Sequence, residues 1–147
     1  MRKLLPLVLV LFASQVFGES KEIAELRKKA EAGDAAAQNN LGVKYDKGQG
    51  ALKDQKEAVK WYRKAAAQGN AFAQNNLGYA YGKGEGVPKD DVAAYAWYSL
   101  GAFPCQELGA ENCEIVAKEM TPEQIAKAQE LSKELLKKIE ANKAKKK

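Results

Sequence analysis

The sequence contains a 36-residue segment that occurs twice in tandem. Residues 35–70, aligned without a gap on residues 71–106, are identical at 17 of 36 positions. The shared positions include the string AQNNLG, two spaced glycines, an aspartate and a Trp-Tyr pair. A fixed period of this length is typical of repeat arrays, in which each unit buries its apolar face against its neighbours. We therefore expect the chain to fold as one stack of similar units.

Each copy is expected to form two helices joined by a loop. Both halves show the i, i+3, i+4, i+7 spacing of one helical face: Gln38, Leu41, Gly42 and Tyr45 in the first half, and Ala58, Trp61, Tyr62 and Ala65 in the second. The glycines between the halves allow a positive-φ turn, and an aspartate follows them as a cap for the second helix. No run with the period of a strand competes with this interpretation. Trp61 and Trp97 are predicted to lie in the core.

Three details of the copies carry further expectations. A glycine inside a helix costs about 1 kcal/mol relative to alanine. The recurrence of Gly42 and Gly78 therefore predicts that another helix backbone approaches closely at this position. The spacing of Asp54 and Glu57 predicts a reciprocal capping box. Gln38 has two open interpretations, as a bridge between adjacent helices or as a residue that binds a partner.

The flanking segments extend the array in both directions. Residues 20–34 repeat the second half of a unit, because Leu26 and Ala30 precede Tyr62 and Ala66 by one period. Further along, the spacing of Cys113, Val116, Ala117 and Met120 predicts another helix, and Thr121-Pro122 supplies the cap and first residue of a last one. We thus expect an all-α solenoid of αα-hairpins with about seven helices. It comprises a partial leading unit (20–34), repeats 35–70 and 71–106, and an atypical C-terminal hairpin that caps the array (107–142).

Residues 1–18 have the layout of a secretory signal peptide. A basic start at Arg2 and Lys3 precedes an apolar run from residue 4 to residue 12 and then small residues. The apolar run is shorter than the roughly 20 residues that span a bilayer. We expect cleavage after Gly18 and export of the remaining chain to a periplasm or beyond, where disulfides persist.

Composition excludes several classes of function. The chain has no histidine, which removes Ser-His and Cys-His nucleophile pairs and histidine metal ligands. The formal net charge of +5 comes from the two ends, since residues 19–136 hold 16 basic and 18 acidic residues. A nucleic-acid-binding body would show a basic face, so no nucleic-acid partner is expected. No catalytic residue, metal site or cofactor is predicted. The basic tail 143–147 is expected to be a solubilising helix end, with a weak contact to anionic lipid as the alternative.

The motif AxAQxxLGxxYxxGxG, followed by the WY and AA elements, closely resembles the Sel-one-like repeat (SLR) family, relatives of the tetratricopeptide repeat. The resemblance covers residues 35–104 strongly, and residues 20–34 and 105–120 weakly. It implies a right-handed αα-superhelix and a role as an adaptor that holds protein complexes together. The family has no common catalytic residues that could be transferred to this sequence.

The resemblance also bears on the two cysteines, Cys105 and Cys113. Their C-x7-C spacing is similar to that of cysteine-rich secreted members of the family, which link their hairpins by disulfides. For an exported chain we therefore expect a disulfide between them, which would tie the C-terminal hairpin to the stack. Two reduced, buried cysteines are the alternative.

Candidate partner-binding residues follow from the concave surface that first helices line in the related repeats. The recurring amides on this surface could bind an extended peptide, and positions that differ between the copies could set specificity. The candidates are Asn39, Asn40, Lys44, Asn75, Asn76, Tyr79 and Tyr95.

The resulting functional hypothesis is an exported module that binds another protein through the concave face. Two alternatives remain. One is a β-lactamase-like enzyme, as some cysteine-rich relatives are described, although the sequence has neither an SxxK nor a GxSxG motif. The other is an inhibitor or immunity-type protein, which differs from the first hypothesis only in its target.

Overall fold

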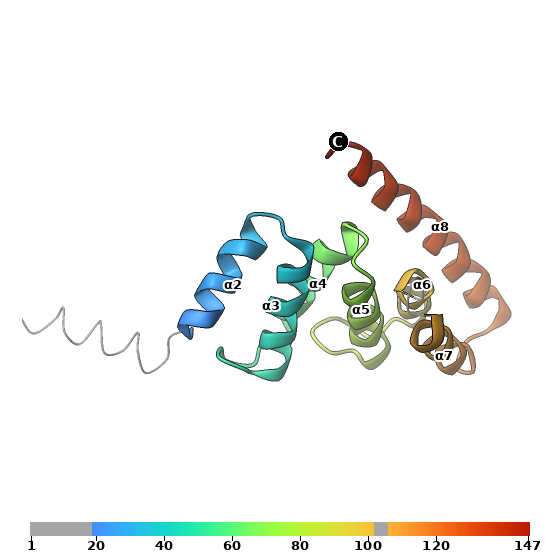
Figure 1. Cartoon of the computed structure of the whole chain (residues 1–147). Helices are drawn as coiled ribbons and strands as arrows, with labels where there is room; N and C mark the ends of the chain where they lie inside the picture. The colour runs from blue at the N-terminus through green and yellow to red at the C-terminus, as the bar shows by residue number, and fades with distance from the viewer. Residues whose placement is uncertain (1–18, 102–105) are drawn as a thin grey trace, which may run out of the picture.

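The computed structural model describes residues 19–101 and 106–147 (Figure 1). This part of the chain forms α2 (Lys21–Glu31), α3 (Ala35–Lys47), α4 (Gln55–Ala67), α5 (Ala71–Lys83), α6 (Asp91–Gly101), α7 (Gln106–Ala117) and α8 (Pro122–Ala144). Over the described ranges there are seven helices and no strand, which confirms the predicted all-α fold. The predicted signal peptide (1–18) and Cys105 lie outside the described residues.

The helix ends follow from the residues that recur at each unit boundary. The side chains of Asp34 and Asn70 each accept a hydrogen bond of 2.9 Å from the backbone N–H three residues later, which begins α3 and α5. Gly48 and Gly84 end these helices in the left-handed region, with φ of 65° and 71°. The repeat period therefore reflects a repeated set of helix starts and stops.

The capping box predicted for α4 forms only in part. The Asp54 side chain accepts from the N–H of Glu57 at 3.0 Å, but its own N–H donates to the carbonyl of Tyr45 at 2.9 Å. The Glu57 carboxylate instead accepts from Trp61 Nε1 at 3.1 Å. The prediction of a reciprocal box was wrong because the backbone of the preceding helix already satisfies the donor that Glu57 would have reached.

Successive helices pack against each other along the array, as Figure 1 shows for α2 to α7. Leu41 and Leu77 are completely buried at equivalent positions of α3 and α5. Trp61 is buried, whereas Trp97 is partly buried against the same core. The prediction that both tryptophans contribute to the core is thus confirmed, with Trp97 at its edge.

Buried glutamines connect each first helix to the helix before it. Gln38 Nε2 donates to the carbonyl of Ala30 at 3.0 Å, and Gln74 Nε2 donates to the carbonyl of Ala66 at 3.2 Å. Both side chains are at least nine-tenths buried, and a buried amide costs free energy unless it is hydrogen-bonded. Of the two interpretations of Gln38, the structure supports the bridge between adjacent helices.

The glycines inside α3 and α5 make room for an aromatic ring. A Cβ on Gly42 would lie 2.6 Å from the Tyr62 ring, and one on Gly78 would lie 2.8 Å from the Tyr98 ring. The Ala58 carbonyl oxygen also lies 3.1 Å from the Cβ built on Gly42, whereas the three atoms nearest to the Cβ built on Gly78 all belong to the Tyr98 ring. The expected approach of another helix backbone is therefore mainly the approach of a tyrosine side chain.

The last helix departs from the repeat pattern. The capping box predicted at Thr121 is present, so α8 begins as expected. It then packs mainly on α6 and, further along, on α4, rather than pairing with α7 as a third hairpin would. Figure 1 shows it running back across the array. The predicted C-terminal hairpin is thus replaced by a helix that spans two units, and Leu100, Leu136 and Ile139 line a pocket of about 460 Å³ beneath it.

The end of α8 meets the C-terminal end of α4. Asn142 Nδ2 lies 3.5 Å from the Ala67 carbonyl, and Lys146 Nζ donates to the Gln68 side chain. Cationic groups are favourable at this place, because the free carbonyls of a helix C-terminus carry partial negative charge. Part of the basic tail therefore has an intramolecular contact, and its interaction with lipid stays a prediction. Over the described helices, none is long and apolar enough to cross a membrane.

Candidate functional site

Three of the five exposed large apolar side chains of the described residues lie on α5 and α7, and the other two, Leu52 and Leu136, lie in a loop and on α8. Phe72 and Tyr79, which are 64% and 47% exposed, are seven residues apart on α5 and therefore lie on one face of the helix. Ile115, which is 54% exposed, lies on α7 one period after Tyr79. Large apolar residues that share an exposed face indicate an interaction surface more strongly than residues scattered singly.

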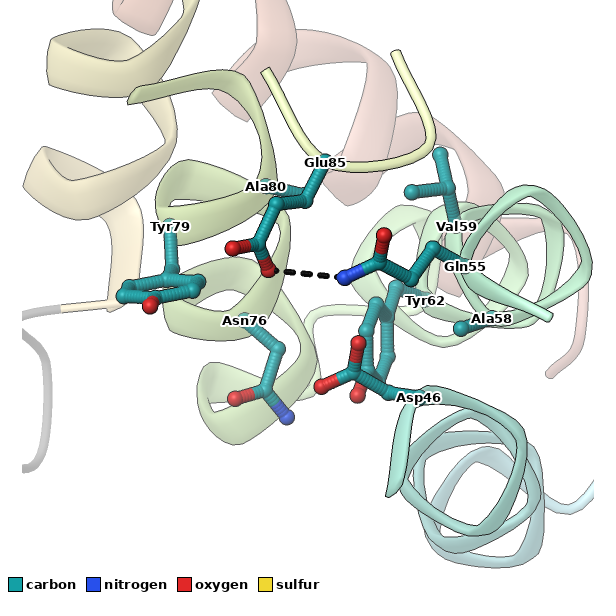
Figure 2. Close-up of a pocket in the computed structure, with 9 residues that line it drawn as sticks. All are labelled: Asp46, Gln55, Ala58, Val59, Tyr62, Asn76, Tyr79, Ala80 and Glu85. Carbon is teal, nitrogen blue, oxygen red and sulfur yellow. Dashed lines mark hydrogen bonds between the residues drawn. The ribbon is translucent and has the colours of Figure 1, made fainter. Parts of the chain in front are cut away.

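A first pocket lies between α3, α4 and α5 beside this apolar stripe (Figure 2). Its volume is about 20 Å³, close to that of one water molecule. Asp46 comes from α3, Tyr62 from α4, and Asn76 and Tyr79 from α5. Figure 2 shows Tyr79 at one side of the pocket and Asp46 with Tyr62 at the other. Burial raises the pKa of Tyr62, and the nearby Asp46 carboxylate raises it further, so this phenol stays neutral.

Two acidic side chains give the first pocket its charge. Asp46 forms no salt bridge within the described residues, and neither does Glu85, whose carboxylate accepts a hydrogen bond of 3.0 Å from Gln55 Nε2. No lysine or arginine lines this pocket. A cationic group of a partner would therefore meet two carboxylates that form no salt bridge within the described residues.

A second pocket lies between α5, α6 and α7 and has a volume of about 420 Å³. Many of its residues follow those of the first pocket by one period: Tyr98 follows Tyr62, Asn112 follows Asn76, Ile115 follows Tyr79, and Val116 follows Ala80. Burial, together with the nearby Tyr79 and Cys113, raises the pKa of Tyr98 to about 12. The two pockets are thus repeat-related, and Tyr79 borders both.

The chemistry of the second pocket differs from that of the first. Gly82 stands where Asp46 lines the first pocket, and Asp91 stands where Gln55 does. Asp91 is paired with Lys89 at 2.9 Å, and the remaining charges, Lys83 and Glu119, have opposite signs. The second pocket is therefore wider, electrically balanced and partly apolar.

Only two of the predicted binding residues, Asn76 and Tyr79, line the first pocket. Asn76 Nδ2 donates to Asn39 Oδ1 at 3.0 Å, and Asn39 is 8% exposed. This bond links α3 to α5, so it holds the wall of the pocket in place. Asn39 is consequently occupied within the fold and has little surface to offer a partner.

The other predicted residues lie elsewhere. Asn40 is exposed on α3 but lines neither pocket. Lys44 pairs with Glu22 of α2 at 3.2 Å. Asn75 Nδ2 donates to the Gly101 carbonyl at 3.1 Å, and its buried Oδ1 has no hydrogen-bond partner among the described residues. Tyr95 is half-buried on α6, away from both pockets. The structure therefore does not gather these four residues with Asn76 and Tyr79.

Several residues of the site were not predicted from the sequence. None of Phe72, Asp46 and Glu85 belongs to a recognisable sequence motif. A signal was nevertheless present, because Asp46 and Gly82 occupy equivalent positions and differ between the copies. Aligning the copies and selecting the mismatches on the first helices would have found Asp46 and Phe72, whereas Glu85 lies in the loop after α5.

The predicted disulfide joins Cys105 to Cys113, and Cys105 lies outside the described residues. Cys113 is half-buried on α7, with its Sγ 3.6 Å from Ser99 Oγ and 3.7 Å from the Tyr95 carbonyl. Burial raises the pKa of the Cys113 thiol, and the contact with Ser99 opposes that effect. The described residues contain no group of three or more side chains suited to a metal ion.

Comparison with known proteins adds to the geometry. A family model for the Sel1 repeat matches residues 35–70 and 71–102. The chain is similar to the structure of a protective antigen present in uropathogenic Escherichia coli strains and displaying an SLR fold, with 39% identity and a TM-score of 0.77 over 80% of this chain and 25% of that one. It is also similar to a Sel1 repeat protein from Oxalobacter formigenes, with 38% identity and a TM-score of 0.57 over 58% of this chain and 25% of that one. The chain thus spans about a quarter of the length of each structure. No curated protein matches it significantly.

Proposed function

Because the chain is a Sel1-repeat protein, we propose that it is an exported adaptor that holds another protein on the exposed side of its first helices. The Sel1 repeat and the SLR fold indicate a protein–protein interaction module. Proteins of this family are in general repeat scaffolds rather than enzymes. No observation on the described residues favours the β-lactamase-like or the inhibitor alternative over this one.

The observation that carries the proposal is that two exposed apolar residues, Tyr79 and Ile115, border two repeat-related pockets. We call the surface made by Asp46, Phe72, Asn76, Tyr79 and Ile115 the first-helix face. It combines large apolar side chains with amides and carboxylates, which is the mixture found where a protein interface has an apolar centre and a polar rim. Aromatic residues are also the commonest anchors of such interfaces.

Site-specific photocrosslinking tests the face. A photoreactive phenylalanine analogue replaces Tyr79 or Ile115 in the full-length protein expressed in a bacterial host, and the control position is Lys60, an exposed residue of α4. We expect one discrete crosslinked species from positions 79 and 115 and none from position 60. Crosslinking from position 60 with silence at 79 and 115 would overturn the choice of face.

Export is the second part of the proposal, and residues 1–18 support it by their basic start and short apolar run. We expect the protein recovered from the envelope fraction to begin at Glu19. Amino-terminal sequencing of that material measures the cleavage site directly. Recovery of the uncleaved chain from the cytoplasmic fraction alone would contradict export. The binding surface is tested separately, by the crosslinks.

A further inference from the structure

The two pockets of the first-helix face are the same structural feature repeated one unit apart, with different contents. The first has room for about one water molecule, and it is bordered by the carboxylates of Asp46 and Glu85. The second has about 420 Å³ of open volume, and Ile115, Val116 and Tyr98 contribute to its lining. A ligand that touches both pockets therefore meets an anionic position and, one unit further, an apolar cavity.

One difference between the copies lies in the lining of the second pocket. Gly82 takes the place of Asp46, and a Cβ built on Gly82 would have as its nearest neighbour only Ala94 Cβ, at 3.6 Å. The space next to Gly82 is thus open, whereas the Cβ positions of Gly42 and Gly78 are filled by tyrosine rings. An aromatic side chain of a partner fits in such a volume, because about 420 Å³ lies within the range of about 300–1,000 Å³ typical of ligand pockets.

The separation of the pockets sets the spacing of the groups that could fill them. Tyr79 of α5 borders both pockets, which lie one repeat unit apart. An extended chain advances about 3.3 Å per residue, and its successive side chains point to opposite sides. Two side chains of one extended segment that enter both pockets therefore lie two or four residues apart.

We propose that the first-helix face takes an extended segment of the partner that carries an arginine or lysine two or four residues from a large apolar or aromatic side chain. The cation lies against Asp46 and Glu85, and the apolar side chain enters the second pocket beside Ile115. Charge complementarity selects this occupant, because the first pocket has two carboxylates and no cationic residue in its lining. The inference rests on the proposed function and adds to it the chemistry of the partner.

Synthetic peptides test this chemistry on the purified mature protein. The probes are labelled Gly-Ser peptides that contain Arg and Trp two or four residues apart, in both orders, and binding is measured by fluorescence anisotropy. We expect one order to bind, and replacing its Trp with Ala to weaken binding at least about tenfold. Replacing its Arg with Gln should weaken binding about two- to fivefold, with the difference disappearing at high salt.

Two variants of the protein provide matched controls. Gly82→Asp gives the second pocket the aspartate that Asp46 provides in the first. This variant should weaken binding of the Arg–Trp peptide at least about tenfold without lowering the melting temperature of the protein. Asp46→Asn, which leaves the Glu85 carboxylate in place, should reduce the preference for Arg over Gln and leave the contribution of Trp unchanged. Gly82→Ala, which adds only a methyl group, should bind the peptide more tightly than Gly82→Asp does.

The outcomes separate this inference from the proposed function. Failure of every Arg–Trp peptide to bind, or equal binding when Glu replaces Arg, would overturn the inference. If crosslinking from positions 79 and 115 persists in that case, the first-helix face still holds a partner, and only its chemistry is different. If Gly82→Asp leaves both the crosslinks and the peptide affinity unchanged, the second pocket is not where the apolar group binds.

Discussion

At the scale of single residues, the glycines inside α3 and α5 have different surroundings and hence different roles. Gly42 and Gly78 each face a tyrosine ring that already fills the place of a Cβ, whereas Gly82 faces open space. The intrinsic helix propensity favours alanine at all three positions by about 1 kcal/mol. The packing at each position therefore decides whether that gain is realised.

Gly42→Ala is expected to lower the free energy of unfolding by about 1–3 kcal/mol, because the added methyl group must displace the buried Tyr62 ring. Gly82→Ala should raise it by about 0.5–1 kcal/mol. Urea denaturation followed by circular dichroism measures both changes. An increase in stability for both variants would show that the tyrosine ring moves aside without cost.

A second local feature is the hydrogen-bonded group of Glu19, Arg27 and Tyr45 at the start of the described chain. Arg27 Nε donates to Glu19 Oε2 at 3.2 Å, and Tyr45 Oη donates to Glu19 Oε1 at 2.5 Å. An equivalent contact joins Arg63 to Tyr81 at 2.9 Å one unit later. The hydrogen bond from Arg27 is the main reason that the pKa of Glu19 lies below its ordinary value of 4.5.

Glu19→Gln is expected to reduce stability at neutral pH and to leave it unchanged in acid. A carboxyl group with a lowered pKa in the folded state stabilises the fold above its unfolded pKa, and this contribution disappears as the pH falls through the folded value. The wild type and the variant should therefore converge below pH 4.5. Urea midpoints measured from neutral pH downward test this, and a constant difference at every pH would contradict it.

At the scale of elements, α8 is the helix whose packing is least like that of the repeats. Ile139 is 4% exposed on it, while Leu136, one turn earlier, is 45% exposed. Since α8 contacts both α6 and α4, it connects the second helices of two successive repeats.

Ile139→Ala is expected to lower the free energy of unfolding by about 2–5 kcal/mol, as for other buried large-to-small changes. Leu136→Ala on the same helix is the matched control, and its effect should stay below about 1 kcal/mol. Chemical denaturation of both variants measures the difference. Equal effects would mean that α8 does not hold its position on α4 in solution.

The junction between α6 and α7 carries the predicted disulfide. We expect thiol titration of the unreduced, denatured mature protein to find no reactive thiol, and titration after reduction to find two. A bridge that closes so short a loop should contribute about 2–3 kcal/mol in the chain-entropy account. Two reactive thiols before reduction would reject the bridge between Cys105 and Cys113.

At the scale of the whole molecule, the helices have unequal numbers of neighbours. The main contact of α2 is with α3, whereas α4 packs against α3, α5 and α8. In a repeat array, stability is distributed through such nearest-neighbour contacts. The interior of the array should therefore open less often than its N-terminal end.

Hydrogen exchange of the mature protein is expected to show faster exchange for α2 than for α4, α5 and α6, since local opening of an end helix breaks the fewest contacts. Mass spectrometry of peptides from each helix measures the protection. Protection in α2 equal to that in α4 would indicate that the whole array opens as one unit, and that the Glu19 group is sufficient to hold α2.

The sequence alone determined the helices, their order and much of their core. These features depend on local chemistry that the two copies display twice: caps at Asp34 and Asn70, turn glycines, and apolar residues at helical spacing. Of the candidate binding residues taken from the repeat, Asn76 and Tyr79 line the first pocket, and their role in binding a partner stays a prediction.

Only the tertiary structure decided the path of α8, the partner of Gly42 and the chemistry of the pockets. The bond between Lys146 and Gln68 joins residues 78 positions apart, a separation unrelated to the 36-residue period. The contact of Asn39 with Asn76 likewise depends on how one unit is rotated against the next. Local spacing specifies which residues share a helical face, but the volume between two faces depends on all the side chains that meet there, and here the absence of one at Gly82 accompanies the wider pocket.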